Sequence, residues 1–249
     1  MRAMLSLGLA WVMLIGSAAG QEGDKEAKAL IDKALQAVGG AEKVNKYAAF
    51  AIKGKGKINI MNMELDLAID IFVQMPGQVR QDVELEINNM KITTIQVFDG
   101  KKGWLKQLNE TKELDDEKLI QEFKEGINAQ RAASLYKLDK GFTFSTVGDA
   151  KVKDKAAVGV RVSHKGFRDI NLFFDKQKGL LVKAEYRALD PLTMKEVGRE
   201  EYFSNYKEVN GVQTAHKMAI FHDGEKFLDL EVTDVRYLEK HDEGTFAKP

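Results

Sequence analysis

The stretch MELDLAIDIFVQMPGQVRQDVELEI, residues 63–87, decides the fold, because its apolar residues recur at every second position on both sides of a short turn. Before the turn the odd-numbered residues are apolar, and the even-numbered Asp66 and Asp70 point the other way. After the turn Val83 and Leu85 alternate with acidic residues in the same manner. Pro76 between the two halves is a typical turn residue. The stretch therefore predicts a long antiparallel hairpin with one apolar and one solvated face.

The stretch VFDGKKGW, residues 97–104, follows one strand later and contains residue types that also occur in catalytic loops. The segments on either side of it are strand-like, and Asp-Gly is a favoured hairpin turn. Asp99 has no histidine, second carboxylate or metal ligand near it in the sequence, so we interpret Asp99 and Gly100 as a turn. Trp104 is predicted to be a wall or rim residue of the apolar face, since an indole combines a large apolar area with one donor.

Two segments have the 3.6-residue period of an amphipathic helix. The first begins at Asp24 and ends at a pair of glycines, Gly39 and Gly40. The second covers residues 115–138, with Asp115 or Asp116 as its N-cap. Its apolar residues share one face and are predicted to form a helical lid over the sheet: Leu119, Ile120, Phe123 and Ile127.

Further alternating segments, separated by tight turns such as Asn210-Gly211 and Asp223-Gly224, continue almost to the C-terminus. We expect about ten or eleven strands in meander order. The predicted fold class is α+β, mainly β: a single curved antiparallel sheet, an unclosed barrel, whose concave face is covered by helices. No linker divides the chain, so residues 21–249 are expected to form one domain.

The composition excludes several classes of function, and the N-terminus indicates where the protein goes. Basic and acidic residues are equal at 38 each, so the chain lacks the basic excess that nucleic-acid binding requires. It contains no cysteine, which excludes disulfides, thiolate metal sites and cysteine nucleophiles. Arg2, an apolar run and small residues before Gln21 are typical of a secretory signal peptide, which we place at residues 1–20. No later stretch is apolar enough to span a membrane, so we expect an exported, soluble mature protein.

The sequence gives weak support for catalysis or metal binding. The four histidines His164, His216, His222 and His241 are scattered, and we interpret them as surface residues. Two of them are six residues apart in one predicted strand, and such residues lie about 20 Å apart, too far to share a metal ion. The motifs G-x-S-x-G and H-E-x-x-H and a phosphate-binding glycine loop are absent. We therefore expect no enzymatic activity, no cofactor and no metal.

The order of these elements resembles the periplasmic lipoprotein carrier and lipoprotein-sorting family, the LolA/LolB-like half-barrels. The family's Pro-x-x-x-Arg turn and Asp-Gly-x-x-x-Trp hairpin correspond here to Pro76, Arg80, Asp99, Gly100 and Trp104. The resemblance implies an unclosed antiparallel barrel, with helices plugging its mouth and acyl chains held in its concavity. In the carrier subgroup a basic residue implicated in opening and closing precedes the turn proline, whereas this chain has Met75. The resemblance thus supports lipid or lipoprotein binding more strongly than the specific carrier cycle.

We predict a non-enzymatic periplasmic carrier or chaperone for the acyl chains of lipids or lipoproteins, acting as a monomer in outer-membrane lipoprotein sorting. Burial of a 16-carbon chain contributes about 10 kcal/mol before binding costs. The expected partners are the lipid or acylated lipoprotein itself and an envelope transporter or outer-membrane receptor. Two alternatives stay open, an envelope structural or interaction protein that pairs through a sheet edge and a secreted hydrolase. The predicted lipid-binding cavity is formed by Leu65, Leu67, Ile69, Ile71, Val79, Val83, Leu85, Ile87 and Trp104.

Overall fold

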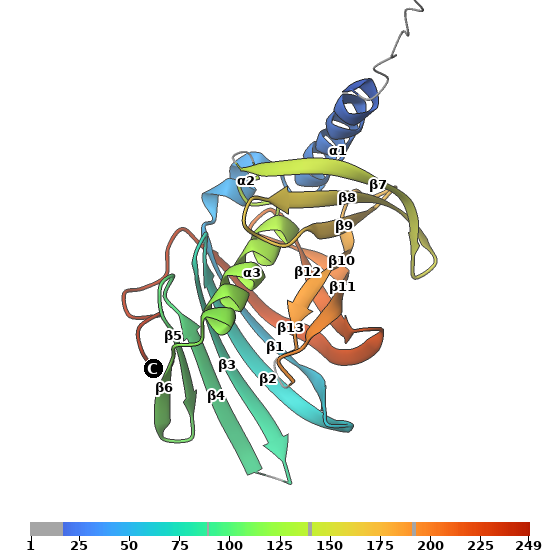
Figure 1. Cartoon of the computed structure of the whole chain (residues 1–249). Helices are drawn as coiled ribbons and strands as arrows, with labels where there is room; N and C mark the ends of the chain where they lie inside the picture. The colour runs from blue at the N-terminus through green and yellow to red at the C-terminus, as the bar shows by residue number, and fades with distance from the viewer. Residues whose placement is uncertain (1–16, 89, 139–140, 191–192) are drawn as a thin grey trace, which may run out of the picture.

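The computed structural model describes residues 17–88, 90–138, 141–190 and 193–249 (Figure 1). Residues 1–16 of the predicted signal peptide therefore lie outside the described residues. Within the described ranges no helix has the length and apolar character that a membrane crossing needs. The helices and strands of these ranges are, in chain order, α1 (Ser17–Ala37), α2 (Ala41–Lys46), β1 (Ala49–Ile60), β2 (Met63–Gln74), β3 (Gln78–Ile87), β4 (Met90–Phe98), β5 (Gly103–Gln107), β6 (Glu110–Leu114), α3 (Glu117–Ala133), β7 (Phe142–Val152), β8 (Lys155–His164), β9 (Ile170–Asp175), β10 (Leu181–Leu189), β11 (Glu196–Val209), β12 (Val212–His222) and β13 (Glu225–Leu238).

All strands of the described residues belong to one antiparallel sheet, in the order β6-β5-β4-β3-β2-β1-β13-β12-β11-β10-β9-β8-β7. Strands β1 to β6 form one meander and β7 to β13 form a second, and the two meanders join where β13 pairs with β1. The two outer strands of this order, β6 and β7, do not pair with each other, so the sheet stays open. The predicted fold class, a mainly β protein with a single curved antiparallel sheet, is confirmed.

The predicted central hairpin is present as β2 and β3. Its register places Leu67 opposite Leu85 and Ile69 opposite Val83, so the apolar residues of both strands share one face. The next turn is also confirmed. The backbone N–H of Asp99 donates to the carbonyl of Lys102 at 3.0 Å, and the Asp99 carboxylate accepts from the N–H groups of Lys101 and Lys102. Asp99 is therefore held as a turn residue.

The predicted number of strands, ten or eleven, is too low, because the described residues form thirteen. Two strands lack the regular apolar alternation on which the prediction was based. In β1, Gly54 and Gly56 occupy the positions where side chains would otherwise point to the face shared by Leu67 and Leu85. A Cβ atom on Gly56 would lie 1.9 Å from the carbonyl oxygen of Asp229, so β1 and β13 approach too closely there for any other residue. Strand β6 is five residues long and mostly exposed.

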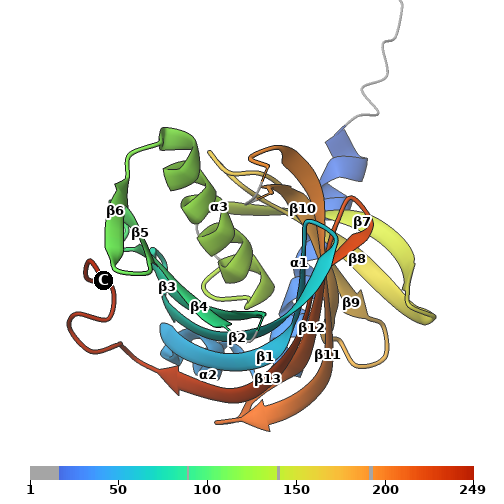
Figure 2. The ribbon, with the colours of Figure 1, turned by 90° about the horizontal axis from the view of Figure 1, so that it is seen from below.

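Helices α1 and α3 lie over the face of the sheet that carries Leu67 and Leu85, which we call the concave face. Figure 2 shows the sheet curving around α3. Helix α1 packs Ala27, Ile31 and Ala34 on the second meander, in a cluster that also includes Ala132 near the end of α3. Because α3 also contacts residues of β2 to β4, it spans the opening between the two meanders.

Candidate functional site

The apolar residues of β2 and β3 on the concave face are buried to different extents along the hairpin. Of the predicted cavity residues, Leu67 and Val79 are buried, as is Val73 on the same face. The other predicted cavity residues of these two strands are half-buried: Leu65, Ile69, Ile71, Val83, Leu85 and Ile87. The structure therefore brings eight of the nine predicted cavity residues onto one continuous face of two paired strands.

Helix α3 covers the end of this face near the β2–β3 turn. Ile127 is buried there with Phe50, Val73 and Phe98, and Ile120 and Phe123 pack at the edge of the same cluster. The rings of Phe98 and Phe123 stack with centroids 5.4 Å apart. Three of the four predicted lid residues thus face the sheet. Leu119 is half-buried and is not among the residues of this cluster.

Two sequence features position α3 on the sheet. Asp116 caps the helix, since its side chain accepts hydrogen bonds from the backbone N–H groups of Lys118 and Leu119. Gly103 at the start of β5 lies beneath the helix, and a Cβ atom there would be 3.3 Å from Ile120 and 3.4 Å from Phe123. A larger residue at position 103 would push the helix away from the sheet.

Beyond α3 the concave face continues as a second apolar cluster that consists of strand residues. Figure 1 shows that β2, β3 and β4 extend past the end of the helix. The buried centre of this cluster is Leu67, Ile220, Leu228 and Leu230. Around it lie partly buried residues that water still reaches: Ile58, Ile69, Val83, Leu85, Met218 and Phe227. We call this set of residues the uncovered cluster. It is apolar and accessible, as a binding surface for an acyl chain must be.

Trp104 does not line the concave face, so its predicted position in the cavity wall is wrong. Its neighbour across the strands is Val97, which in turn lies opposite Arg80 of β3, and these residues point to the convex face. There Trp104 is buried to 7 % exposure against Val97 and against Phe246 of the C-terminal segment. Trp104 therefore anchors the end of the chain on the back of the sheet.

The histidines were expected at the surface, but three of them are buried. His241 lies on the convex side, where its Nε2 atom is 3.0 Å from the carbonyl oxygen of Phe50 and 3.1 Å from that of Val73. The Nδ1 atom of His222 is 3.1 Å from a carboxylate oxygen of Asp190, and burial lowers the pKa of His222. His216 and His222 contact different residues. Among the described residues no group of three or more metal-ligating side chains is placed to hold an ion.

The sequence matches no protein-family model and no curated protein. Solved structures do match it. A DUF1329 family protein from Desulfovibrio piger has a TM-score of 0.57 at 13 % sequence identity, covering 89 % of this chain and 97 % of its own. A LolA superfamily protein from Nitrosomonas europaea has a TM-score of 0.55 at 9 % identity, with the same coverage of both chains. A putative outer membrane lipoprotein-sorting protein domain from Vibrio parahaemolyticus has a TM-score of 0.53 at 12 % identity, again with 89 % and 97 % coverage.

The chain has the LolA-like fold. Within this LolA-like chain, Arg80 of the turn motif forms two hydrogen bonds with the carboxylate of Asp82, at 2.7 and 2.8 Å. It also reaches the carbonyl oxygen of Thr245 at 3.4 Å. Arg80 and Trp104 therefore both hold the C-terminal segment on the convex face. Met75, which stands where the carrier subgroup has a basic residue, is buried in the apolar cluster beneath α3.

Helix α3 of this LolA-like chain has a polar edge that sequence reasoning missed. Glu122 accepts from the backbone N–H of Leu189 at 3.0 Å and forms an ion pair with Arg168 at 2.8 Å. Glu125 accepts from the backbone N–H of Arg168 at 3.0 Å. One helical turn later, Asn128 lies 2.8 Å from Nδ1 of His164. Because these three residues are spaced three apart along the helix, they form one row, and this row fastens α3 to the second meander.

His164 sits in an aromatic stack at the end of this row. Its ring lies between Phe142, at a centroid distance of 4.3 Å, and Phe167, at 4.7 Å. Burial lowers the pKa of His164, and the positive charge of Arg131 lowers it further. Both effects favour the neutral form of His164, which suits a contact with a neutral amide.

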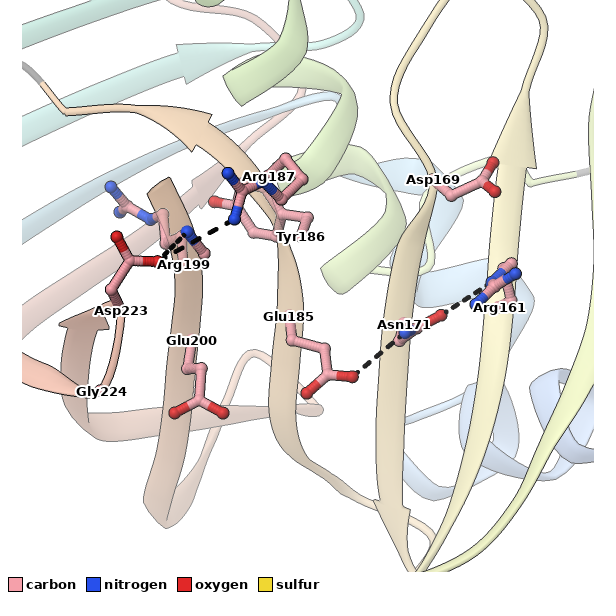
Figure 3. Close-up of a pocket in the computed structure, with 11 residues that line it drawn as sticks. Arg161, Asp169, Asn171, Glu185, Tyr186, Arg187, Arg199, Glu200, Asp223 and Gly224 are labelled. Atoms are coloured by element: carbon pink, nitrogen blue, oxygen red, sulfur yellow. Dashed lines mark hydrogen bonds and ion pairs between the residues drawn. The ribbon is translucent and has the colours of Figure 1, made fainter. Parts of the chain in front are cut away.

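A polar pocket of about 580 Å³ lies on the convex side of β8 to β11 (Figure 3). Several of its polar and charged groups bind one another or a neighbouring side chain. Arg161 donates to Asn171 at 3.1 Å, and Asn171 donates to Glu185 at 3.1 Å. Lys183 forms ion pairs with both Glu185 and Glu200. This ladder of hydrogen bonds and ion pairs connects neighbouring strands with polar groups, which do not suit an acyl chain.

Proposed function

We propose that this protein is a periplasmic carrier that holds the acyl chains of lipids or lipoproteins on the concave face of its sheet. The observation that carries the proposal is the uncovered cluster. Leu85, Ile69 and Val83 stay partly exposed to water although they continue the buried face beneath α3. Methylene groups placed on this cluster would gain about 0.8 kcal/mol each from burial.

Helix α3 would act as the lid. The apolar residues Ile120, Phe123 and Ile127 of the lid lie on the first meander, and a chain that entered beneath the helix would have to replace these contacts. Displacement of the helix would also break the hydrogen bonds that Glu122 and Glu125 make with the second meander. The polar row would thus hold the lid closed on the second meander. An apolar ligand that replaced the contacts on the first meander would release it.

The fold supports this proposal at the level of the architecture. The Vibrio structure is described as a putative outer membrane lipoprotein-sorting protein domain, and the Nitrosomonas structure as a LolA superfamily protein. In this chain Met75 is buried beneath the lid, so a basic residue before the turn proline does not take part in closure. We infer that the row of Glu122, Glu125 and Asn128 has that role here.

Native mass spectrometry of the mature protein, purified without detergent from a bacterial host, tests the proposal. The expected result is a near-stoichiometric additional mass that solvent extraction identifies as lipid. A protein that stays free of lipid during purification, and after incubation with phospholipid and long-chain fatty acid, would contradict it.

A further inference from the structure

The exposed large hydrophobic side chains of the described residues are concentrated at one end of the sheet. Met61 is 81 % exposed and Met63 is 50 % exposed in the β1–β2 hairpin, Met90 is 63 % exposed where β4 begins, and Leu108 is 77 % exposed in the β5–β6 turn. Because the first meander is antiparallel throughout, every second turn lies at the same end, and these three turns point together to the lower end of Figure 1.

Only two other large hydrophobic side chains of the described ranges are exposed, each at 42 %. Met194 lies in the connection between β10 and β11, which the strand register places at the same end of the sheet. Val147 lies within β7, away from this end. The concentration at the hairpin ends is therefore a property of one end of the molecule and not of its whole surface.

The hairpin ends are continuous with the uncovered cluster. Met63 belongs to the same strand face as Leu65 and Leu67, and Met90 lies opposite Ile87, the last concave-face residue of β3. An apolar path therefore leads from the exposed methionines to the concave face without crossing a charged side chain. The β2 carboxylates of Glu64 and Asp66 point to the convex face.

The lysines Lys57 and Lys91 near these hairpin ends are each paired with a glutamate. Lys57 pairs with Glu64 at 2.5 Å, and Lys91 pairs with Glu84 at 2.7 Å. The surface therefore has flexible apolar side chains on separate projections and no excess of basic charge. Such a surface fits the interface of a lipid bilayer, which deforms around separate projections, and it does not depend on anionic headgroups.

We propose that the hairpin ends bearing Met61, Met63, Met90 and Leu108 dock this protein on the surface of a phospholipid membrane. The apolar side chains enter the headgroup region, and the open end of the concave face then stands against the bilayer. Acyl chains pass between membrane and protein along the path from Met63 to Leu67. This delivery role rests on the proposed function, whereas the docking itself does not.

Flotation with phosphatidylcholine vesicles tests the docking. We compare the wild-type chain with the triple variant M61Q/M90Q/L108Q and with V147Q, which removes an exposed hydrophobic side chain from another part of the sheet. All these positions are exposed, so each variant should fold. The triple variant is expected to lower the bound fraction about tenfold or more, while V147Q and high salt leave it unchanged.

Insertion is measured with single tryptophans. The fluorescence of L108W should be quenched by brominated phosphatidylcholine, and that of V147W should not. Equal binding of the triple variant, or binding that needs anionic lipid and disappears in salt, would overturn the proposal. So would a wild-type chain that binds a soluble fatty acid but no vesicle, because a protein partner would then cover these hairpins. Vesicle binding that depends on the hairpin ends, without fatty-acid binding, would support the docking. That result would contradict only the carrier function.

Discussion

Replacement of Leu85 with glutamate separates ligand binding from folding, because Leu85 lies in the uncovered cluster and is only half-buried. It stands opposite Leu67 of β2 and Ile92 of β4, in the part of the concave face beyond α3. In the free protein the new carboxylate can reach water, so we expect the free energy of unfolding to fall by about 1 kcal/mol.

Leu85→Glu lowers the affinity for an acyl chain more strongly than it lowers the free energy of unfolding. A carboxylate at this position stays hydrated and keeps an acyl chain from contact with Leu67 and Ile92. Loss of contact with about four methylene groups at about 0.8 kcal/mol each amounts to about 3 kcal/mol, which weakens binding by about 100-fold. Leu67→Glu is the less informative change, since Leu67 is buried and a charge there would unfold the sheet.

The assay is titration of the mature protein with a fluorescent long-chain fatty acid, with circular dichroism and urea unfolding as checks of the fold. Ser204→Glu is the matched control, because Ser204 is exposed and lies opposite Lys217, outside the concave face. A folded Leu85→Glu variant that binds the fatty acid as tightly as the wild type would refute the assignment of this face. An equal loss in Ser204→Glu would show that added charge alone weakens binding.

Four further predictions concern the lid, the fold and the dependence on pH. Glu122→Gln weakens a partly exposed ion pair, so hydrogen exchange of the α3 amides should become about tenfold faster, equivalent to about 1.4 kcal/mol. Gly126→Ala should raise the free energy of unfolding by about 1 kcal/mol, measured in urea, because Gly126 is exposed within α3 and an added Cβ would meet no atom. Phe246→Ala should cost about 3 kcal/mol of stability and leave fatty-acid affinity unchanged, because Phe246 packs on Trp104 behind the sheet. The pKa of His164 is lowered in the folded state, so the stability that neutral His164 contributes is complete above about pH 6.5 and is lost as the pH falls. In His164→Gln, Tm should therefore decline less steeply as the pH falls.

Each of these predictions has a result that would contradict it. Unchanged exchange in Glu122→Gln, with Lys124→Gln on the exposed side of α3 as control, would show that the polar row does not hold the lid. A destabilised Gly126→Ala would mean that the helix needs the conformational freedom of glycine. Weaker fatty-acid binding in a folded Phe246→Ala variant would place the ligand on the convex face. An equal pH dependence of Tm in His164→Gln would assign that dependence to other groups.

The position of Trp104 shows where prediction of the face fails. The face of a residue depends on the length of every turn before it. The β2–β3 pairing joins odd to odd residue numbers, as in Leu67 and Leu85, whereas β3–β4 joins Val79 to Phe98 and β4–β5 joins Phe98 to Gly103. Residue 103 therefore lies on the concave face and residue 104 behind it. The alternation within each hairpin strand is visible in the sequence, but the turn lengths that connect them are fixed by the folded register.

The lid illustrates the same division between local and distant information. The apolar positions Ile120, Phe123 and Ile127 follow from the helical period, and the cap was predicted at Asp115 or Asp116, of which Asp116 takes that role. The contacts of Glu122 were not, because its partners are 46 and 67 residues further along the chain. A glutamate on a helix is normally a solvated residue. Only the packed structure shows that Glu122 holds α3 on the second meander.

The pairing of β1 with β13 has a consequence for the synthesis of the protein. Thr233 hydrogen-bonds to the backbone of Lys53, 180 residues earlier in the chain, whereas the other strand pairs are joined by short connections. Long-range contacts form slowly because the loop between them must close first, so we expect each meander to form by itself and this pair to form last. Until β13 has been made, β1 is an unprotected edge. The apolar side of β2 and β3 then also lacks the apolar residues of β12 and β13 that complete its cluster. A growing chain is therefore most prone to aggregate in the interval between the completion of the first six strands and the arrival of the last.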